Sequence, residues 1–262
     1  MKPEAHRMIT DIAISRCGDV LSEKMKSFKT EIIQGTDDED STQFYSRITN
    51  WHFYRANDLI PKTVNRYYGE CKTTSEDILQ KRIDDMKSFS TDDKEYYNNL
   101  GRVIHHIQDM STPSHVVPVY HALFIKDHFE KYMVKHINES DLRDAVLLDN
   151  EVIDFKSIYN KSAIETLNYV DNTSFNAEDI YSITVDLPLS MFWESYNPNK
   201  NSIKGFGSYG TLHKAFKKIK DKTEVSVDDY TIQKEELDKI NVYVYNKALQ
   251  DTCEALIYAN QL

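Results

Sequence analysis

Apolar residues recur every three to four positions along most of the chain, which is the period of helices that bury one face. In the first such segment, over 3–15, Ile9, Ile12 and Ala13 share a face. The same pattern predicts further helices over 19–32, 75–88, 92–110, 121–136, 157–170, 178–193 and 231–260. Two segments that are acidic or rich in glycine and asparagine are predicted to be irregular, 35–52 and 197–212. The sequence therefore predicts an all-α fold.

The last predicted helix has an apolar stripe long enough to lie across a bundle. Leu237, Ile240, Val244 and Leu256 fall on that stripe, which indicates a core helix. No linker divides the 262 residues, and single domains of this size occur. We therefore expect one domain over 1–262, built as a multi-helix bundle.

The composition is typical of a globular protein, with 40% hydrophobic and 28% charged residues. No apolar run approaches the roughly 20 residues that span a bilayer, so no transmembrane segment is expected. The N-terminal stretch "MKPEAHRMIT" lacks the basic start, apolar middle and cleavage site of a secretory signal. A cytoplasmic location is the default expectation, with secretion if a leader was removed.

The formal charge of −10 disfavours a general binder of polyanions, because lysine and arginine supply most of the affinity for nucleic acid. One stretch differs from the rest: "KNSIKGFGSYGTLHKAFKKIKDK", at 200–222, has seven lysines against one aspartate, interleaved with Phe206, Tyr209 and Phe216. Such a stretch could contact anionic lipid headgroups or a nucleic-acid backbone with stacked bases. The alternative is a glycine loop followed by a solvated helix.

The cysteines provide no metal site of their own. Cys17, Cys71 and Cys253 are odd in number and far apart, which matches neither a disulfide framework nor a closely spaced zinc–thiolate motif. We expect reduced thiols. Any metal ligands must therefore come from histidines and carboxylates.

Histidines crowd one part of the chain, since six of the nine lie in 105–136. In "HHIQDMSTPSH", at 105–115, His105 and Asp109 are four residues apart on a predicted helix, so both side chains lie on one face. Pro113 should bend or end this helix, and His115 would then approach from another direction. A histidine oriented by a carboxylate for structural reasons has the same spacing, but the density of histidines favours a metal site.

Four segments, in order along the chain, resemble the zinc-dependent phospholipase C and single-strand nuclease superfamily. "LGRVIHHIQDMSTPSH", at 100–115, is similar to that family's histidine, aspartate, proline and histidine at fixed offsets after a leucine-glycine pair. Three upstream segments are similar to further family segments: "NWHFYRANDLIPK" at 50–62, "GTDDED" at 35–40 and "EAHRMITDIAI" at 4–14. The resemblance covers roughly the first half of the chain and implies a metal cluster between helices.

The resemblance implies up to three zinc ions, held by residues at the matching positions. One zinc would take Asp40, His52, His105 and Asp109, and Asp109 would bridge to a second zinc that also takes His6. The third would take His115 and Glu130, completed by His121 or else by Asp127, with His128 a weaker candidate. This chain departs from the family in lacking an N-terminal tryptophan that shares the metal of His6, and in having Lys126 where another histidine is expected.

The other polar residues near the matched segments are interpreted as structural. His106 follows a ligand and points about 100° away from it on the helix, so a supporting role is expected. Ordinary packed or exposed histidines are expected at two positions outside the pattern, His136 and His213. A solvated acidic turn is expected from three acids that could otherwise replace Asp40, namely Asp37, Asp38 and Glu39.

Histidine and carboxylate ligands without thiolates favour Lewis-acid hydrolysis over redox chemistry. Clustered metals suit phosphodiesters, because they polarise the phosphoryl group, lower the pKa of bound water and stabilise the leaving oxygen. Asp40 could both bind metal and accept a proton from the attacking water. This chemistry leads us to expect hydrolysis of a phosphodiester. The resemblance implies a phospholipase C-like enzyme that acts on a phospholipid, for which a peripheral contact with a membrane surface is possible.

Substrate identity is less well indicated than the reaction. Thr49 stands where the phosphatidylcholine-cleaving relatives have an aromatic residue of the choline pocket, so a preference for choline is not expected. A zinc nuclease acting on single strands is the second hypothesis, which the low overall basicity disfavours. The third is a catalytically silent binding module that keeps its metals for folding.

Overall fold

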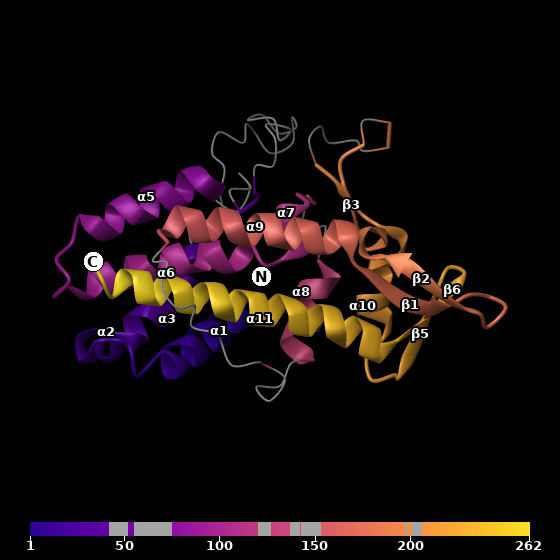
Figure 1. Ribbon diagram of the computed structural model, residues 1–262, viewed down its shortest axis with the longest axis horizontal. Helices are drawn as coiled ribbons and strands as arrows, with labels where there is room; N and C mark the ends of the chain where they lie inside the picture. The colour runs from indigo at the N-terminus through magenta and orange to yellow at the C-terminus, as the bar shows by residue number, and fades with distance from the viewer. Residues whose placement is uncertain are drawn as a thin grey trace.

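The structure, a computed structural model, describes residues 1–41, 52–54, 75–119, 127–136, 142, 153–197, 199–200 and 206–262. Its helices lie along most of the long axis, and its strands gather at one end (Figure 1). The helices are α1 (Pro3–Arg16), α2 (Glu23–Ser27), α3 (Lys29–Ser41), α5 (Ser75–Lys87), α6 (Lys94–Asp109), α7 (Pro113–Val116), α8 (His128–Lys135), α9 (Phe155–Asn172), α10 (Ala215–Lys218) and α11 (Lys234–Ala259). The strands are β1 (Ser174–Glu178), β2 (Thr184–Pro188), β3 (Trp193–Glu194), β4 (Ser208–Tyr209), β5 (Glu224–Val227) and β6 (Tyr230–Gln233), and two 3₁₀ helices are η2 (Leu189–Met191) and η3 (Thr211–Lys214).

The expectation of an all-α fold is wrong, because the strands form two antiparallel sheets. The larger sheet has the order β2-β1-β6-β5, and the smaller one pairs β3 with β4. In place of the predicted helix over 178–193, the chain forms the end of the β1–β2 hairpin and then η2. Phe175 and Ala177 on β1 are buried between exposed neighbours, which is the two-residue period of a half-buried strand.

Most predicted helices are confirmed at their centres and differ at their ends. The predicted helix over 19–32 is interrupted at Phe28, which ends α2 before α3 begins. α3 continues to Ser41, so the first part of the segment expected to be irregular is helical. The last predicted helix begins as β6 and becomes α11 at Lys234, and α8 begins at His128.

α3 and α6 cross at two glycines, Gly35 and Gly101. A Cβ at Gly101 would lie 2.0 Å from the carbonyl oxygen of Ile32, and a Cβ at Gly35 would lie 2.0 Å from that of Asn98. Both distances are far below van der Waals contact, so a side chain at either position would push the backbones apart. Gly35 therefore lies inside a helix despite its low helix propensity. The contact sets the distance between the C-terminal halves of α3 and α6.

α11 runs along most of the molecule and packs against α1, α6 and α9 (Figure 1). The predicted core helix is confirmed by the burial of its apolar stripe, Leu237, Ile240, Val244 and Leu256. α11 also packs Cys253 against α1, where its thiol donates to the carbonyl oxygen of Ala13 (4.0 Å), and Cys17 and Cys253 are both buried free thiols. Among the residues that the structure describes, no helix is long and apolar enough to cross a membrane.

Candidate metal centre

Helix α6 supplies the centre of the site. His105 and Asp109 point from the same face, with His105 Nε2 3.3 Å from Asp109 Oδ2. Both side chains are only 1% exposed. Ionisable groups are seldom buried this deeply unless they are paired or bind a metal. The helix thus brings together the two residues whose spacing predicted a ligand pair.

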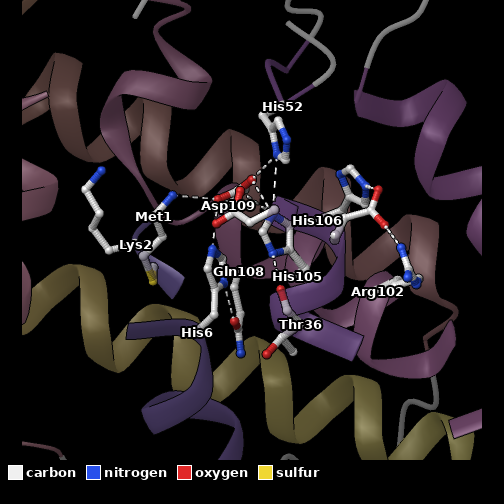
Figure 2. A network of polar contacts seen from close by, with 12 residues as sticks. Met1, Lys2, His6, Thr36, His52, Arg102, His105, His106, Gln108 and Asp109 are labelled. Atoms are coloured by element: carbon white, nitrogen blue, oxygen red, sulfur yellow. Dashed lines mark hydrogen bonds and ion pairs between the residues drawn. The ribbon is translucent and has the colours of Figure 1, made fainter. Parts of the chain in front are cut away.

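Side chains from three other segments converge on this pair, and two of them, His6 and His52, are labelled in Figure 2. His6, on α1, approaches Asp109 Oδ1 to 3.4 Å through Nε2, and His52 approaches Asp109 Oδ2 to 2.8 Å through Nδ1. Asp40, near the end of α3, lies 4.0 Å from His105 Nε2. Among the described residues, these side chains form two groups that could each hold a metal ion. The first is His6, His105 and Asp109, and the second is Asp40, His52 and His105; within each group the ligand atoms lie within 4.8 Å of one another.

His115 and Glu130 extend the site beyond Asp109. α7 begins at Pro113 and turns the chain after α6, which places His115 Nδ1 3.6 Å from Asp109 Oδ2. His115 Nε2 lies 3.2 Å from Glu130 Oε1 on α8. The terminal amine of Met1 lies between these groups, 2.8 Å from Asp109 Oδ1 and 3.1 Å from Glu130 Oε1. A positive charge therefore occupies the space between carboxylates from two helices.

The three buried histidines of the site are held in the same way. Each donates its Nδ1–H to an oxygen and directs Nε2 toward a carboxylate of the site. The acceptors are the side chain of Gln108 for His6 (2.6 Å), the carbonyl of Thr36 for His105 (2.9 Å) and the carbonyl of His52 for His115 (2.9 Å). Gln108 is itself oriented, because its Nε2 donates to Thr10 and Thr252. A neutral ring held like this has its lone pair on Nε2, as metal-binding histidines do.

The charges of the site act strongly on one another. Burial lowers the pKa of His105, but the carboxylates of Asp109 and Asp40 outweigh burial and raise the pKa to about 9. Burial and the charge of His105 lower the pKa of His6 to about 4. Burial raises the pKa of Asp109, but the positive charges of His115, the terminal amine and His105 hold it well below its usual range. A proton on His105 thus offsets the charge of Asp109 in a place where a metal ion would do the same.

A second polar network lies beside the cluster, between α3, α5 and α6. The carboxylate of Glu39 accepts hydrogen bonds from Arg82 (2.8 and 3.0 Å) and Arg102 (3.0 Å), and it lies 3.2 Å from His106 Nε2. The expectation of a solvated acidic turn is wrong for Glu39, because α3 continues through it and buries its side chain. Burial raises the pKa of Glu39, but its bonds to His106 and Arg82 hold it well below its usual range. Its basic partners are distant in sequence, so no local pattern reveals this network.

The residues named to complete the third zinc site are only partly described. His121 lies outside the described residues. Asp127 caps α8, where Oδ1 accepts from Phe129 N–H (2.7 Å), and it lies 3.2 Å from His213 Nε2. His213 is buried and stacks on Tyr209, with ring centroids 4.0 Å apart. This small cluster had no signal in the sequence, because its members come from three separate elements.

The second half of the chain covers one side of the site. Phe206 packs edge-to-face on Phe53, the neighbour of His52, with ring centroids 5.2 Å apart. Gly207 N–H donates to the carbonyl of Pro118 (2.9 Å), and the following residues form β4 within a segment expected to be irregular. Phe206 and Phe216 are buried. Two of the three aromatic residues interleaved with the lysines are therefore not available to stack on bases.

Comparisons with protein-family models, with curated proteins and with solved structures find no match for this chain. The resemblance to zinc-dependent phospholipases accordingly stays a prediction, and the chemistry of the site itself has to support any function.

Proposed function

We propose that the chain is a metal-dependent phosphodiester hydrolase of the phospholipase C type, with zinc as its metal. The observation that supports this most is the common arrangement of His6, His105 and His115. Each has Nδ1 bound to an oxygen and Nε2 directed at Asp109 or Glu130. Support of one ring nitrogen by a polar group, with the other turned to a shared centre, is typical of zinc ligands.

The donor set fits zinc. It contains imidazole nitrogens and carboxylate oxygens without thiolates, which is typical of catalytic zinc sites. Within the described residues, His6 Nε2 is buried without a hydrogen-bond partner, although Asp109 Oδ1 is 3.4 Å away. A lone pair facing a carboxylate oxygen in a buried place is unfavourable unless a cation or proton lies between them. Because Oδ1 faces His6 and Oδ2 faces His52 and His105, Asp109 is placed to bridge two metal ions.

Bound zinc would lower the pKa of a coordinated water toward ~7 and offset the charge of the phosphoryl group. The chain's own residues orient that water and take its proton. The side chains of Asp40 and His52 are more accessible than that of Asp109, being 21% and 17% exposed against 1%. Burial alone would raise the pKa of Asp40, but His105, His52 and other positive groups lower it. Asp40 is therefore an ionised carboxylate at the solvent side of the site, where it can accept a proton.

A phospholipid is the substrate class that we favour. The formal charge of −10 and the burial of Phe206 and Phe216 weigh against a single-strand nuclease, which needs cationic and stacking contacts. A silent module stabilised by metal predicts zinc binding without turnover. A structural zinc needs only four protein ligands, and this site brings together more nitrogen and oxygen ligands than that. We therefore favour catalysis.

The test compares zinc content and hydrolysis in two matched variants. Asp109→Asn removes the bridging charge, and Asp84→Asn makes the same change at an exposed position of α5. We expect Asp109→Asn to lose zinc and to hydrolyse mixed phospholipid at least ~100-fold more slowly, whereas Asp84→Asn keeps both properties. Unchanged turnover in Asp109→Asn would refute the assigned site. If the wild type binds zinc but cleaves neither phospholipid nor single-stranded DNA, the silent module is correct; cleavage of DNA alone identifies a nuclease.

A further inference from the structure

The hairpin of β1 and β2 ends in an exposed apolar tip. This tip, residues 179–183, carries Ile180, Tyr181 and Ile183, which are 67%, 76% and 58% exposed. Other exposed large apolar residues in the described part of the chain stand singly, for example Ile164 on α9. Single exposed apolar residues are ordinary, but a group of them at one turn indicates a partner.

The apolar tip is a well-defined turn. Asp179 Oδ1 accepts from the backbone N–H groups of Tyr181 (2.8 Å) and Ile183 (2.9 Å). Asp179 N–H donates to the carbonyl of Ile183 (3.0 Å), and Ser182 N–H donates to that of Asp179 (3.0 Å). Ser182 adopts a left-handed φ of 60°, which this network holds in place. The same turn that orders the backbone leaves the apolar side chains exposed.

These hydrogen bonds also allow the apolar tip to enter an environment with little water. A backbone N–H that leaves water without a partner is costly, and this cost excludes most loops from lipid. The N–H groups of Asp179, Tyr181, Ser182 and Ile183 already have partners within the turn. The tip can therefore lose water around its side chains without leaving these donors unpaired.

The shape of the apolar tip favours a fluid surface over a second protein. The β1–β2 connection projects from one end of the molecule, beyond the rest of the sheet (Figure 1). A stable protein interface buries about 800 Å² on each side, which is more than three side chains on a narrow turn can present. A lipid surface accepts a convex apolar group without a matching concave partner. The ring of Tyr181, apolar with a polar end, is typical of residues at membrane–water interfaces.

The charge around the apolar tip distinguishes between lipid surfaces. No lysine or arginine occurs between Lys161 and Lys200, whereas three acids lie on the hairpin that carries the tip: Glu178, Asp179 and Asp186. Glu178, next to the tip, is exposed. Anionic lipids attract clusters of lysine and arginine and would be repelled here. A zwitterionic surface carries no net charge, and its cationic groups can approach both carboxylates and a tyrosine ring.

We propose that the apolar tip inserts into the headgroup region of a zwitterionic phospholipid surface and holds the protein there. This contact differs from the one expected for the lysine-rich stretch at 200–222, which would require anionic lipid. One lysine of that stretch, Lys214, already forms an ion pair within the protein, with Asp228 (3.2 Å). The proposal goes beyond phosphodiester hydrolysis, because it concerns binding and is measured without following turnover.

Co-sedimentation of the full chain with phosphatidylcholine vesicles tests the proposal. Ile180→Ser combined with Ile183→Ser makes the tip polar, and Ile164→Ser is the matched change at a position 51% exposed on α9. We expect the double variant to bind vesicles at least ~10-fold more weakly than the wild type, with an unchanged thermal midpoint. Ile164→Ser should bind like the wild type, and adding phosphatidylserine to the vesicles should weaken wild-type binding.

Several outcomes would overturn the proposal. They are an absence of wild-type binding to phosphatidylcholine, equal binding by the double variant, and binding that depends on phosphatidylserine and disappears in salt. A dimer that the double variant abolishes would assign the tip to a protein contact instead. As an independent measurement, Tyr181→Trp should show a blue-shifted tryptophan emission on vesicles. Unchanged emission would count against insertion.

Discussion

Gly101→Ala tests whether the glycine contact between α3 and α6 sets the geometry of the metal centre. The new Cβ would lie 2.0 Å from the carbonyl oxygen of Ile32, where ordinary contact begins at 3.4 Å, so the backbones must separate by the difference of about 1.4 Å. Metal–ligand distances vary by only about 0.2 Å. A shift of this size would move Asp40, on α3, out of reach of a metal held by His105 and Asp109 on α6.

The expected magnitudes follow from two opposing effects. Overpacking typically costs ~1–3 kcal/mol, whereas alanine is favoured over glycine inside a helix by about 1 kcal/mol. We therefore expect Gly101→Ala to lower the free energy of unfolding by about 1 kcal/mol and the zinc affinity by at least ~10-fold. Urea unfolding and zinc titration of the same preparation measure the two quantities, and circular dichroism shows whether the variant is folded.

Two further variants control the interpretation. In Gly18→Ala, the nearest atom to the new Cβ is the carbonyl oxygen of Ser15 in the same turn, at 3.2 Å, so zinc affinity should not change. Gly35→Ala places its Cβ in the same contact between α3 and α6 as Gly101→Ala does. If the two helices move apart, the steric clashes of both substitutions are relieved together. The double variant should therefore lose less stability than the sum of the single variants. A folded Gly101→Ala protein with wild-type zinc affinity would refute the reasoning, as would full additivity.

Two other changes probe residues that support the ligands. Gln108→Leu removes the oxygen that holds His6 Nδ1, so zinc affinity in competition with a chromogenic chelator should fall ~10–100-fold; an unchanged affinity would show that His6 needs no such support. Glu39→Gln removes the charge shared by Arg82 and Arg102 and should lower the free energy of unfolding at pH 7 by ~3 kcal/mol. Because the pKa of Glu39 is held below its usual range, its contribution is present above pH ~4.3 and is lost as the pH falls. The difference from wild type should therefore shrink in urea unfolding at acidic pH, and a constant difference would contradict the ion-pair explanation.

Local periodicity predicts the helices that bury one continuous face, such as α6 and α11. It fails at the β1–β2 hairpin, because a short apolar run with a few acids is compatible with either period until its partner strand is known. The expected loop from 35 onward fails for a related reason. Gly35 indicates a turn when it is considered alone, and only the approach of Gly101 explains why a helix continues through it.

The sequence by itself determined the pairing of His105 with Asp109, because backbone hydrogen bonds within one turn set the direction of residues four apart. The resemblance to zinc-dependent phospholipases, and no local spacing, implied that His6, Asp40 and His52 would join them. Only the tertiary structure decided which atoms approach, and it showed that Glu39 is buried in a salt-bridge network. The relative direction of two side chains on one helix depends on a few neighbouring residues. The convergence of side chains from different helices depends on how those helices pack. That packing rests on contacts, such as the one between the two glycines, whose partners no local pattern identifies.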